Sequence, residues 1–162
     1  MSKSIVDSPP GKVLRFGLRL PIWFYRARFG WMLGDRFLLL NHTGRKSGLL
    51  RQTVIEVVQH DKTVDTYYVV SGWGEKSDWY RNIRKDPSVV IQTGRRTFRS
   101  TAEFIPVEKA IEIVQTYAQD HPFAFNELSR MFLGERLESS IDTPKWLAEK
   151  MPMVAFTPET LA

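Results

Sequence analysis

The chain has 162 residues, 43% of them hydrophobic and 25% charged, so it has enough apolar material for one folded domain and is not a disordered tail. It contains no cysteine, which excludes a disulfide scaffold, a thiolate zinc site, an iron–sulfur cluster and a cysteine nucleophile. Its three histidines, His42, His60 and His121, are far apart in the sequence and lack the spacing of a histidine metal site.

The net charge of +5 is unevenly distributed along the chain. The first 51 residues carry ten basic and two acidic residues, a net charge of +8, and the remaining 111 residues carry 13 basic and 16 acidic residues, a net charge of −3. A cationic N-terminal third indicates an anionic partner, and the candidates are nucleic acid, phospholipid and a phosphorylated small molecule.

Residues 1–34 are predicted to form a polar lead-in and two short amphipathic helices, 13–20 and 22–33, divided at Pro21. Arginines and Pro21 interrupt this stretch, so it lacks the roughly twenty apolar residues of a transmembrane helix and the uncharged core of a signal peptide. Its aromatic face fits helices packed over the core, and the alternative is peripheral membrane contact through an interfacial helix. We expect a cytoplasmic protein, with membrane association through these helices as the alternative.

Residues 35–162 are predicted to form a single domain that is rich in short strands. The pattern of apolar and β-branched residues predicts strands at 36–41, 51–59, 66–71, 88–93, 97–104 and 151–157. A short helix is predicted over Asp78–Lys85, with Ser77 as its cap. A second helix is predicted to begin with Pro106 at its first position, and a third is predicted to end near Gly134. Most strands form antiparallel hairpins, which favours an α+β fold, a closed or nearly closed small barrel, over a doubly wound parallel sheet.

The first candidate site is the loop after the first strand, which combines basic residues with two glycines. Glycines let backbone N–H groups approach a ligand closely, and cations with a hydroxyl can bind a phosphate through charged hydrogen bonds. The pattern is not a P-loop, because its glycine spacing is shorter and a strand follows it. The alternative is an ordinary solvated hairpin. The residues that form this candidate phosphate site are Gly44, Arg45, Lys46, Ser47, Gly48 and Arg51.

The second candidate site is a glycine loop that ends the third strand and begins a helix. A helix N-terminus presents unpaired N–H groups to an anion or to a polarised carbonyl, and two tryptophans are positioned to flank a flat ring. The alternative is that both indoles are core residues. The residues of interest in this segment are Ser71, Gly72, Trp73, Gly74, Trp79 and Asn82.

The order of these segments is specific. Gly-Arg-Lys-Ser-Gly-x-x-Arg enters a strand, a later strand ends at Ser71 with a glycine loop, and Trp-Tyr-x-Asn-Ile and Asp-Pro-x-Val follow. From about Leu38 to Phe104 this arrangement resembles the deazaflavin-dependent nitroreductase and quinone reductase family, whose members are similar to the flavin-binding split β-barrel oxidoreductases.

The resemblance implies a split β-barrel that binds coenzyme F420, a deazaflavin with a phosphate and a glutamate tail. It implies hydride transfer from the reduced cofactor to quinones, nitro compounds or similar activated acceptors, and the cofactor itself carries this chemistry. The first loop then holds the phosphate, and the ring and side chain lie along Ser71, Gly72, Gly74 and Trp79. Ser71 is the candidate catalytic residue, which orients the acceptor or supplies a proton, and Tyr117 is a second candidate.

The sequence departs from the family pattern around the ring site. The glycine loop is short, Ser77 and Asp78 replace a proline that often precedes the Trp-Tyr pair, and Trp73 stands where smaller residues are usual.

FMN is the alternative cofactor, because its phosphate suits the same cations, and a non-catalytic lipid or fatty-acid binder is the alternative function. Nucleic-acid binding is disfavoured, since the basic residues form no recognisable module. The expected partners are a small-molecule cofactor and acceptor, and the chain is a candidate homodimer.

Overall fold

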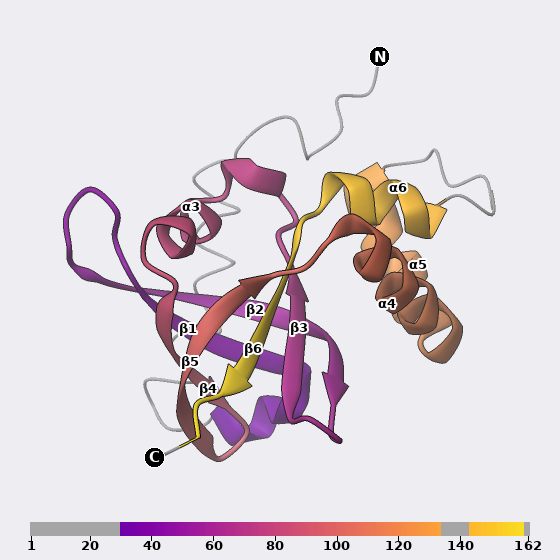
Figure 1. Cartoon of the computed structure of the whole chain (residues 1–162). Helices are drawn as coiled ribbons and strands as arrows, with labels where there is room; N and C mark the ends of the chain where they lie inside the picture. Colours follow the sequence, from indigo (N-terminus) through magenta and orange to yellow (C-terminus); the bar gives the residue numbers. More distant parts are fainter. Residues whose placement is uncertain (1–29, 134–142, 161–162) are drawn as a thin grey trace.

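The computed structural model describes residues 30–133 and 143–160, and six strands in this part of the chain close into a barrel (Figure 1). Their order is β1-β2-β3-β6-β5-β4, with β4 returning to β1, and every pairing is antiparallel. Closure removes the free edges of an open sheet. The predicted α+β class with a small barrel is confirmed. The strands are β1 (Phe37–Thr43), β2 (Leu50–Asp61), β3 (Thr66–Val70), β4 (Ser88–Thr93), β5 (Arg96–Phe104) and β6 (Met153–Pro158).

Helices flank the barrel on two sides. Helices α4, α5 and α6 gather on one side, and α3 lies on the other beside β1 (Figure 1). A short segment, η2, leads directly into β1, and another, η3, precedes α3. The helical segments are η2 (Gly30–Arg36), η3 (Gly74–Lys76), α3 (Asp78–Lys85), α4 (Val107–Asp120), α5 (Pro122–Leu133) and α6 (Thr143–Lys150).

Two apolar cores follow from the alternation of side chains along the strands. Within β2, Ile55 and Val57 lie in the barrel interior, whereas Val58 packs toward the helices α4–α6. Burying a large aliphatic or aromatic side chain contributes roughly 1.5–3 kcal/mol, so both cores hold the barrel and its helices together. The first strand is buried on both faces, because Leu38 and Leu40 are interior and Leu39 is also buried.

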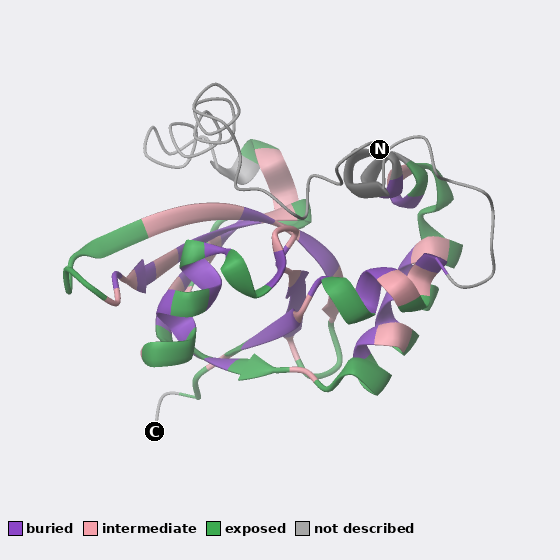
Figure 2. Ribbon diagram, turned by 90° about the horizontal axis from the view of Figure 1, so that it is seen from above, coloured by how far each residue is buried: buried purple, intermediate pink, exposed green. Residues whose placement is uncertain are grey.

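The hairpin of β1 and β2 extends away from α4–α6, so the loop between its strands lies far from those helices (Figure 1). Figure 2 shows that the hairpin is exposed at its tip and buried where it enters the barrel. Leu49 and Leu50 at the tip are exposed. The loop is therefore accessible to a ligand while the barrel holds its base.

Three local features differ from the sequence-based expectations. Ser77 stands at the N-cap of α3 as predicted, but its side chain makes no capping hydrogen bond and faces Ser71 instead. Pro106 is the N-cap of α4 rather than its first residue. Helix α6 was not predicted as an element of its own, because its eight residues are too few to show a clear apolar period.

The predicted N-terminal helix 13–20 and most of helix 22–33 lie outside the described residues. The described end of the second one, from Gly30, is the 3-10 segment η2, whose backbone is broken at Gly34 with φ 57° and ψ −151°. The predicted boundary between residues 1–34 and 35–162 falls inside η2 and stays a prediction.

Candidate functional site

The loop between β1 and β2 is closed by two backbone hydrogen bonds. Gly44 N donates to Leu49 O and Gly48 N donates to Gly44 O, both over 2.8 Å. Gly48 has φ +67°, in the left-handed region that favours glycine, and a Cβ on Gly44 would lie 2.7 Å from Ser47 Oγ. The turn therefore requires glycine at Gly48, whereas a Cβ at Gly44 would displace the side chain of Ser47.

The three cations of this loop differ in their surroundings. Arg45 is held against α3, with Nη2 donating to Asp78 Oδ1 over 3.0 Å and Nη1 donating to Asn82 Oδ1 over 2.9 Å. Arg51 Nη2 lies 3.5 Å from Ser47 Oγ, and no carboxylate of the described chain pairs with it. Lys46 is exposed and makes no hydrogen bond or ion pair with the residues that the structure describes. Two positive charges thus remain available to an anion, and the third anchors the loop.

Beneath the loop, a buried polar network connects β1 to α3. Asn82 Oδ1 accepts hydrogen bonds from both the main-chain N and the guanidinium of Arg45, over 3.1 and 2.9 Å. Its Nδ2 donates to His42 Nδ1 over 3.2 Å, and Lys85 Nζ donates to Arg45 O over 2.8 Å. We call His42, Arg45, Asp78 and Asn82 the loop cluster.

His42 is held in its neutral form in this network. The pKa of His42 is lowered from 6.5 to about 4, chiefly by burial of the imidazole and also by the positive charge of Arg51, while the carboxylate of Asp78 opposes the shift. At neutral pH the ring therefore carries one proton and offers one acceptor nitrogen.

The second predicted motif forms a compact turn at the end of β3. Ser71 Oγ donates to Gly74 O over 2.7 Å and lies 2.6 Å from Ser77 Oγ. Ser71 is fully buried, so contact between its hydroxyl and an acceptor requires the turn to open. Gly74 has φ +62°, and a Cβ there would lie 3.2 Å from Lys150 O. The geometry gives Ser71 a role in holding the turn, and its catalytic role stays a prediction.

The two tryptophans of this motif have different environments. Trp79 lies in the barrel core, edge-on to Tyr80 with ring centroids 5.9 Å apart. This is the core placement that the sequence left open as the alternative. Trp73 and Gly72 are half-buried in the turn that precedes η3.

Helix α3 brings the two predicted motifs together. Its residue Asp78 pairs with Arg45 of the first loop, and Ser77, immediately before it, contacts Ser71 of the second. Since Val57 pairs with Val69, the end of β3 lies alongside the middle of β2. The turn at Ser71 therefore lies alongside β2, and α3 connects it to the loop between β1 and β2.

A cavity of about 590 Å³ lies where β2 faces α4 and α5. Its size is typical of small-molecule sites, and its wall combines apolar side chains with several polar ones. Tyr117 is the one cavity residue that the sequence suggested for a role in the reaction. The lining residues are Asp35, Arg36, Glu56, Val57, Val58, Gln59, His60, Thr116, Tyr117, Asp120, His121 and Ala124.

Two polar groups of this cavity lie near each other. Glu56 pairs with Arg36, its Oε1 lying 3.3 Å from Nη2, and Tyr117 lines the same cavity. Burial of the phenol is the main cause that raises the pKa of Tyr117, and the negative charge of Glu56 adds to it. The phenol keeps its proton at neutral pH and is a hydrogen-bond donor in the cavity.

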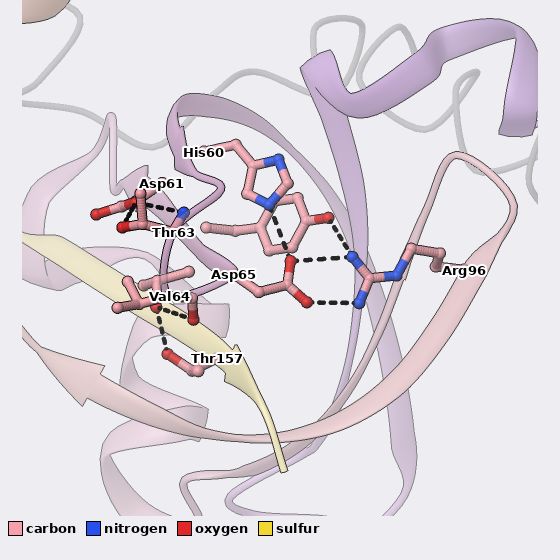
Figure 3. A network of polar contacts seen from close by, with 9 residues as sticks. His60, Asp61, Thr63, Val64, Asp65, Arg96 and Thr157 are labelled. Atoms are coloured by element: carbon pink, nitrogen blue, oxygen red, sulfur yellow. Dashed lines mark hydrogen bonds and ion pairs between the residues drawn. The ribbon is translucent and has the colours of Figure 1, made fainter. Parts of the chain in front are cut away.

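A second charged cluster closes the end of the barrel at the other end of β2 (Figure 3). Arg96 donates to both oxygens of Asp65, over 2.9 and 2.6 Å, and to the hydroxyl of Tyr67 over 3.2 Å. His60 Nε2 donates to Asp65 Oδ1 over 3.0 Å, and its ring stacks on Tyr67 with centroids 3.8 Å apart. We call His60, Asp65, Tyr67 and Arg96 the barrel-end cluster.

A model of the F420H(2)-dependent quinone reductases matches residues 18–125. This chain belongs to that family. The match spans both predicted motifs and the β2 segment of the cavity, so the resemblance seen in the sequence is confirmed. The protein is an oxidoreductase that uses reduced coenzyme F420, and the alternatives of an FMN protein or a non-catalytic lipid binder are not favoured.

Solved structures share the fold at low sequence identity. An F420-H2-dependent reductase, FDR-A, is 20% identical, with 76% of this chain and 95% of that chain covered and a TM-score of 0.50. The conserved hypothetical protein Rv2991 from Mycobacterium tuberculosis is 14% identical, with 98% and 87% covered and a TM-score of 0.53. A structure described as a domain-swapped dimer is 19% identical, with 84% and 98% covered and a TM-score of 0.51.

Sequence reasoning did not identify His42, Asp78 or Glu56 as site residues. His42 and Asn82 are forty residues apart, and nothing in the linear pattern joins them. A usable signal existed for His42 alone, since it lies just before the glycine loop in a strand with buried alternate positions.

Among the described residues, no helix has the length and apolar character needed to cross a bilayer.

Proposed function

We propose that the 44–48 loop and Arg51 hold the phosphate of coenzyme F420, and that the cavity beside β2 receives the quinone acceptor. The observation that carries the proposal is the imbalance of charge in the loop. Arg45 is neutralised by α3, whereas Lys46 and Arg51 have no acidic partner in the described chain. An anion with several oxygens, such as a phosphodiester, fits two such cations beside a closed glycine turn.

The acceptor site is supported by the composition of the cavity. Val57, Val58 and Ala124 supply apolar wall, while Thr116 and Tyr117 supply hydroxyl donors. A quinone has a flat apolar ring and two carbonyl acceptors, so it suits a wall of this kind. Val57 at the cavity wall pairs with Val69 of β3, two residues before Ser71, so a ring held at this turn would lie beside the strand that borders the cavity.

In the proposed reaction, the cofactor and the residues of the chain have separate roles. When bound, the reduced deazaflavin supplies a hydride. A quinone that accepts a hydride also needs one proton at a carbonyl oxygen to become a hydroquinone. Tyr117 holds a proton on its hydroxyl at neutral pH and lines the cavity, so we assign it that donation. Ser71 acts by holding the turn beside the ring.

Equilibrium titration by fluorescence tests the cofactor assignment. The wild-type protein is titrated with F420, with FMN, and with the deazaflavin that lacks the phosphate and glutamate tail. We expect F420 to bind most tightly and the tail-less deazaflavin at least tenfold more weakly, because it loses the charged hydrogen bonds of the loop. Equal affinity for F420 and its tail-less form would contradict a phosphate site at this loop.

Two further proposals concern self-association of the chain and its contact with a membrane. We propose a homodimer, supported by the structural likeness to a domain-swapped dimer, and light scattering of the purified chain measures its mass. Peripheral membrane contact through the N-terminal helices stays a prediction, because the helices lie outside the described residues. Flotation with anionic liposomes, compared between the full chain and a chain truncated before Asp35, tests it.

A further inference from the structure

His42 connects two strands of the barrel to the helix that anchors the phosphate loop. Its Nε2 lies 3.4 Å from Thr53 Oγ1 on β2, and its Nδ1 lies 3.2 Å from Asn82 Nδ2 on α3. Asn82 in turn binds the main chain and the side chain of Arg45. Both His42 and Asn82 are at most 5% exposed, so water does not replace these hydrogen bonds.

The directions of these hydrogen bonds are determined by Arg45. Its main-chain N and its guanidinium can only donate, so the atom of Asn82 that faces them is the carbonyl oxygen. The amide nitrogen of Asn82 must then face His42, and a nitrogen that carries hydrogens needs an acceptor. His42 Nδ1 is therefore unprotonated, and the ring proton is on Nε2, from which it donates to Thr53.

We propose that His42 is a positioning residue for the cofactor's phosphate, which acts through Asn82 to hold the loop at Arg45. This inference rests on the proposed phosphate site. It assigns Arg45 to the anchoring of the loop and leaves Lys46 and Arg51 as the phosphate ligands. Arg45 main-chain N is the start of the turn, so its hydrogen bond to Asn82 sets where the two following cations stand.

The charged groups around His42 agree with a neutral ring. Arg51 faces it from β2 and Asp78 faces it from α3, and Arg45 completes the surroundings from the loop. A proton added to Nδ1 would remove the acceptor for Asn82 and place a third positive charge beside Arg45 and Arg51. The network therefore operates with one tautomer of His42, the one with the proton on Nε2.

Two substitutions of similar shape separate the acceptor function from packing. His42→Leu removes the acceptor, and His42→Asn places an amide oxygen near the position of Nδ1, so it can still accept from Asn82. Each variant is titrated with F420 and with the deazaflavin that lacks phosphate and tail. We expect His42→Leu to weaken F420 binding about tenfold, which corresponds to the loss of roughly one hydrogen bond. The affinity for the tail-less ligand should be unchanged. His42→Asn should restore most of the F420 affinity.

The outcomes distinguish this inference from the function on which it rests. If the wild-type chain prefers F420 over the tail-less ligand and His42→Leu keeps that preference in full, the positioning role is wrong while the phosphate site stands. Equal loss of both ligands in His42→Leu, with no recovery in His42→Asn, would also overturn it, because that pattern indicates general damage. If the wild type shows no preference, the phosphate site itself fails.

A measurement on the wild-type protein covers the case in which His42→Leu does not fold. The ¹⁵N chemical shifts of the imidazole report its tautomer directly. At pH 7 we expect a neutral ring with the proton on Nε2. A proton on Nδ1, or a doubly protonated ring, is incompatible with acceptance from Asn82 and would overturn the proposal.

Discussion

The two charged clusters at the ends of β2 contain similar groups but differ in how their charges are balanced. The loop cluster and the barrel-end cluster each combine an arginine, an aspartate and a histidine. At the barrel end, Arg96 and Asp65 meet through two hydrogen bonds, so the charges are matched within the cluster. At the loop, Arg45 pairs with Asp78, whereas Lys46 and Arg51 have no acidic partner among the described residues.

The difference supports the proposal that the loop, and not the barrel-end cluster, binds the anionic cofactor. A matched pair stabilises the connection between two elements and attracts no further anion, because its field is cancelled nearby. Unmatched cations on an accessible loop keep their attraction for an anionic ligand. The comparison predicts that substitutions at the loop change ligand affinity with little effect on stability, and that substitutions at the barrel end do the reverse.

Removing the two unmatched cations should have the largest effect on cofactor affinity. We expect Lys46→Ala with Arg51→Ala to weaken F420 binding by about a hundredfold, since a charged hydrogen bond contributes roughly 1.5–3 kcal/mol and about 1.4 kcal/mol is one decade. The maximal rate at saturating cofactor should change little, because these groups lie at the cofactor's tail. Titration fluorescence and steady-state kinetics measure both quantities.

The matched control for this variant removes the same charge elsewhere. Lys62 and Arg99 are both exposed and lie away from the loop, so Lys62→Ala with Arg99→Ala lowers the net charge equally. We expect this control to bind F420 nearly as the wild type does. A similar loss in both double variants would mean that net charge, rather than the loop, attracts the cofactor.

The cavity residue Tyr117 should affect turnover rather than cofactor affinity. Tyr117→Phe keeps the ring and removes the hydroxyl that we assign to proton donation. We expect the rate with a soluble naphthoquinone to fall by about a hundredfold or more, the range that general acid catalysis contributes, while the F420 dissociation constant is unchanged. An unaltered rate with a normal dissociation constant would exclude Tyr117 as the donor.

At the barrel end, Arg96→Ala tests the other half of the comparison. Its ion pair with Asp65 is partly exposed, so we expect a loss of about 1 kcal/mol in the free energy of unfolding, or a fall of roughly 2–4 °C in Tm. F420 affinity should stay at the wild-type value. A weakened affinity without a change in Tm would mean that this cluster also contributes to binding.

The remaining predictions concern the pH dependence of stability. The hydrogen bonds from Arg96 lower the pKa of Asp65 from 3.8 to about 2, so its contribution is complete above pH 4 and is lost as the pH falls toward 2. Burial lowers the pKa of His42, so between pH 6.5 and 4 the unfolded chain binds the proton more readily and stability falls as pH falls.

Thermal unfolding at a series of pH values separates these two windows. We expect Asp65→Asn to flatten the curve below pH 4 and His42→Asn to flatten it between pH 6.5 and 4. If His42→Asn loses stability between pH 6.5 and 4 as steeply as the wild type does, the buried neutral state of His42 is not the cause.

Much of the fold and half of the site could be predicted, because both depend on local patterns. The β-branched strands and the helix at Asp78–Lys85 follow from residues that are close in sequence. The glycine loop was recognised for the same reason, since its two glycines lie within one turn. The cavity was not predicted, because its wall combines residues of β2 with residues of α4 and α5, which are distant in sequence.

The sequence by itself determined which groups are available: a short glycine turn with three cations, a serine turn before an aromatic helix, and strands whose alternation makes a barrel. The tertiary structure decided what each group does. Arg45 became an anchor because α3 places Asp78 and Asn82 against it, and Ser71 became buried because Ser77 and Gly74 enclose its hydroxyl. A charge or a hydroxyl binds a ligand only where the folded chain leaves it without an internal partner, and such partners are distant in sequence.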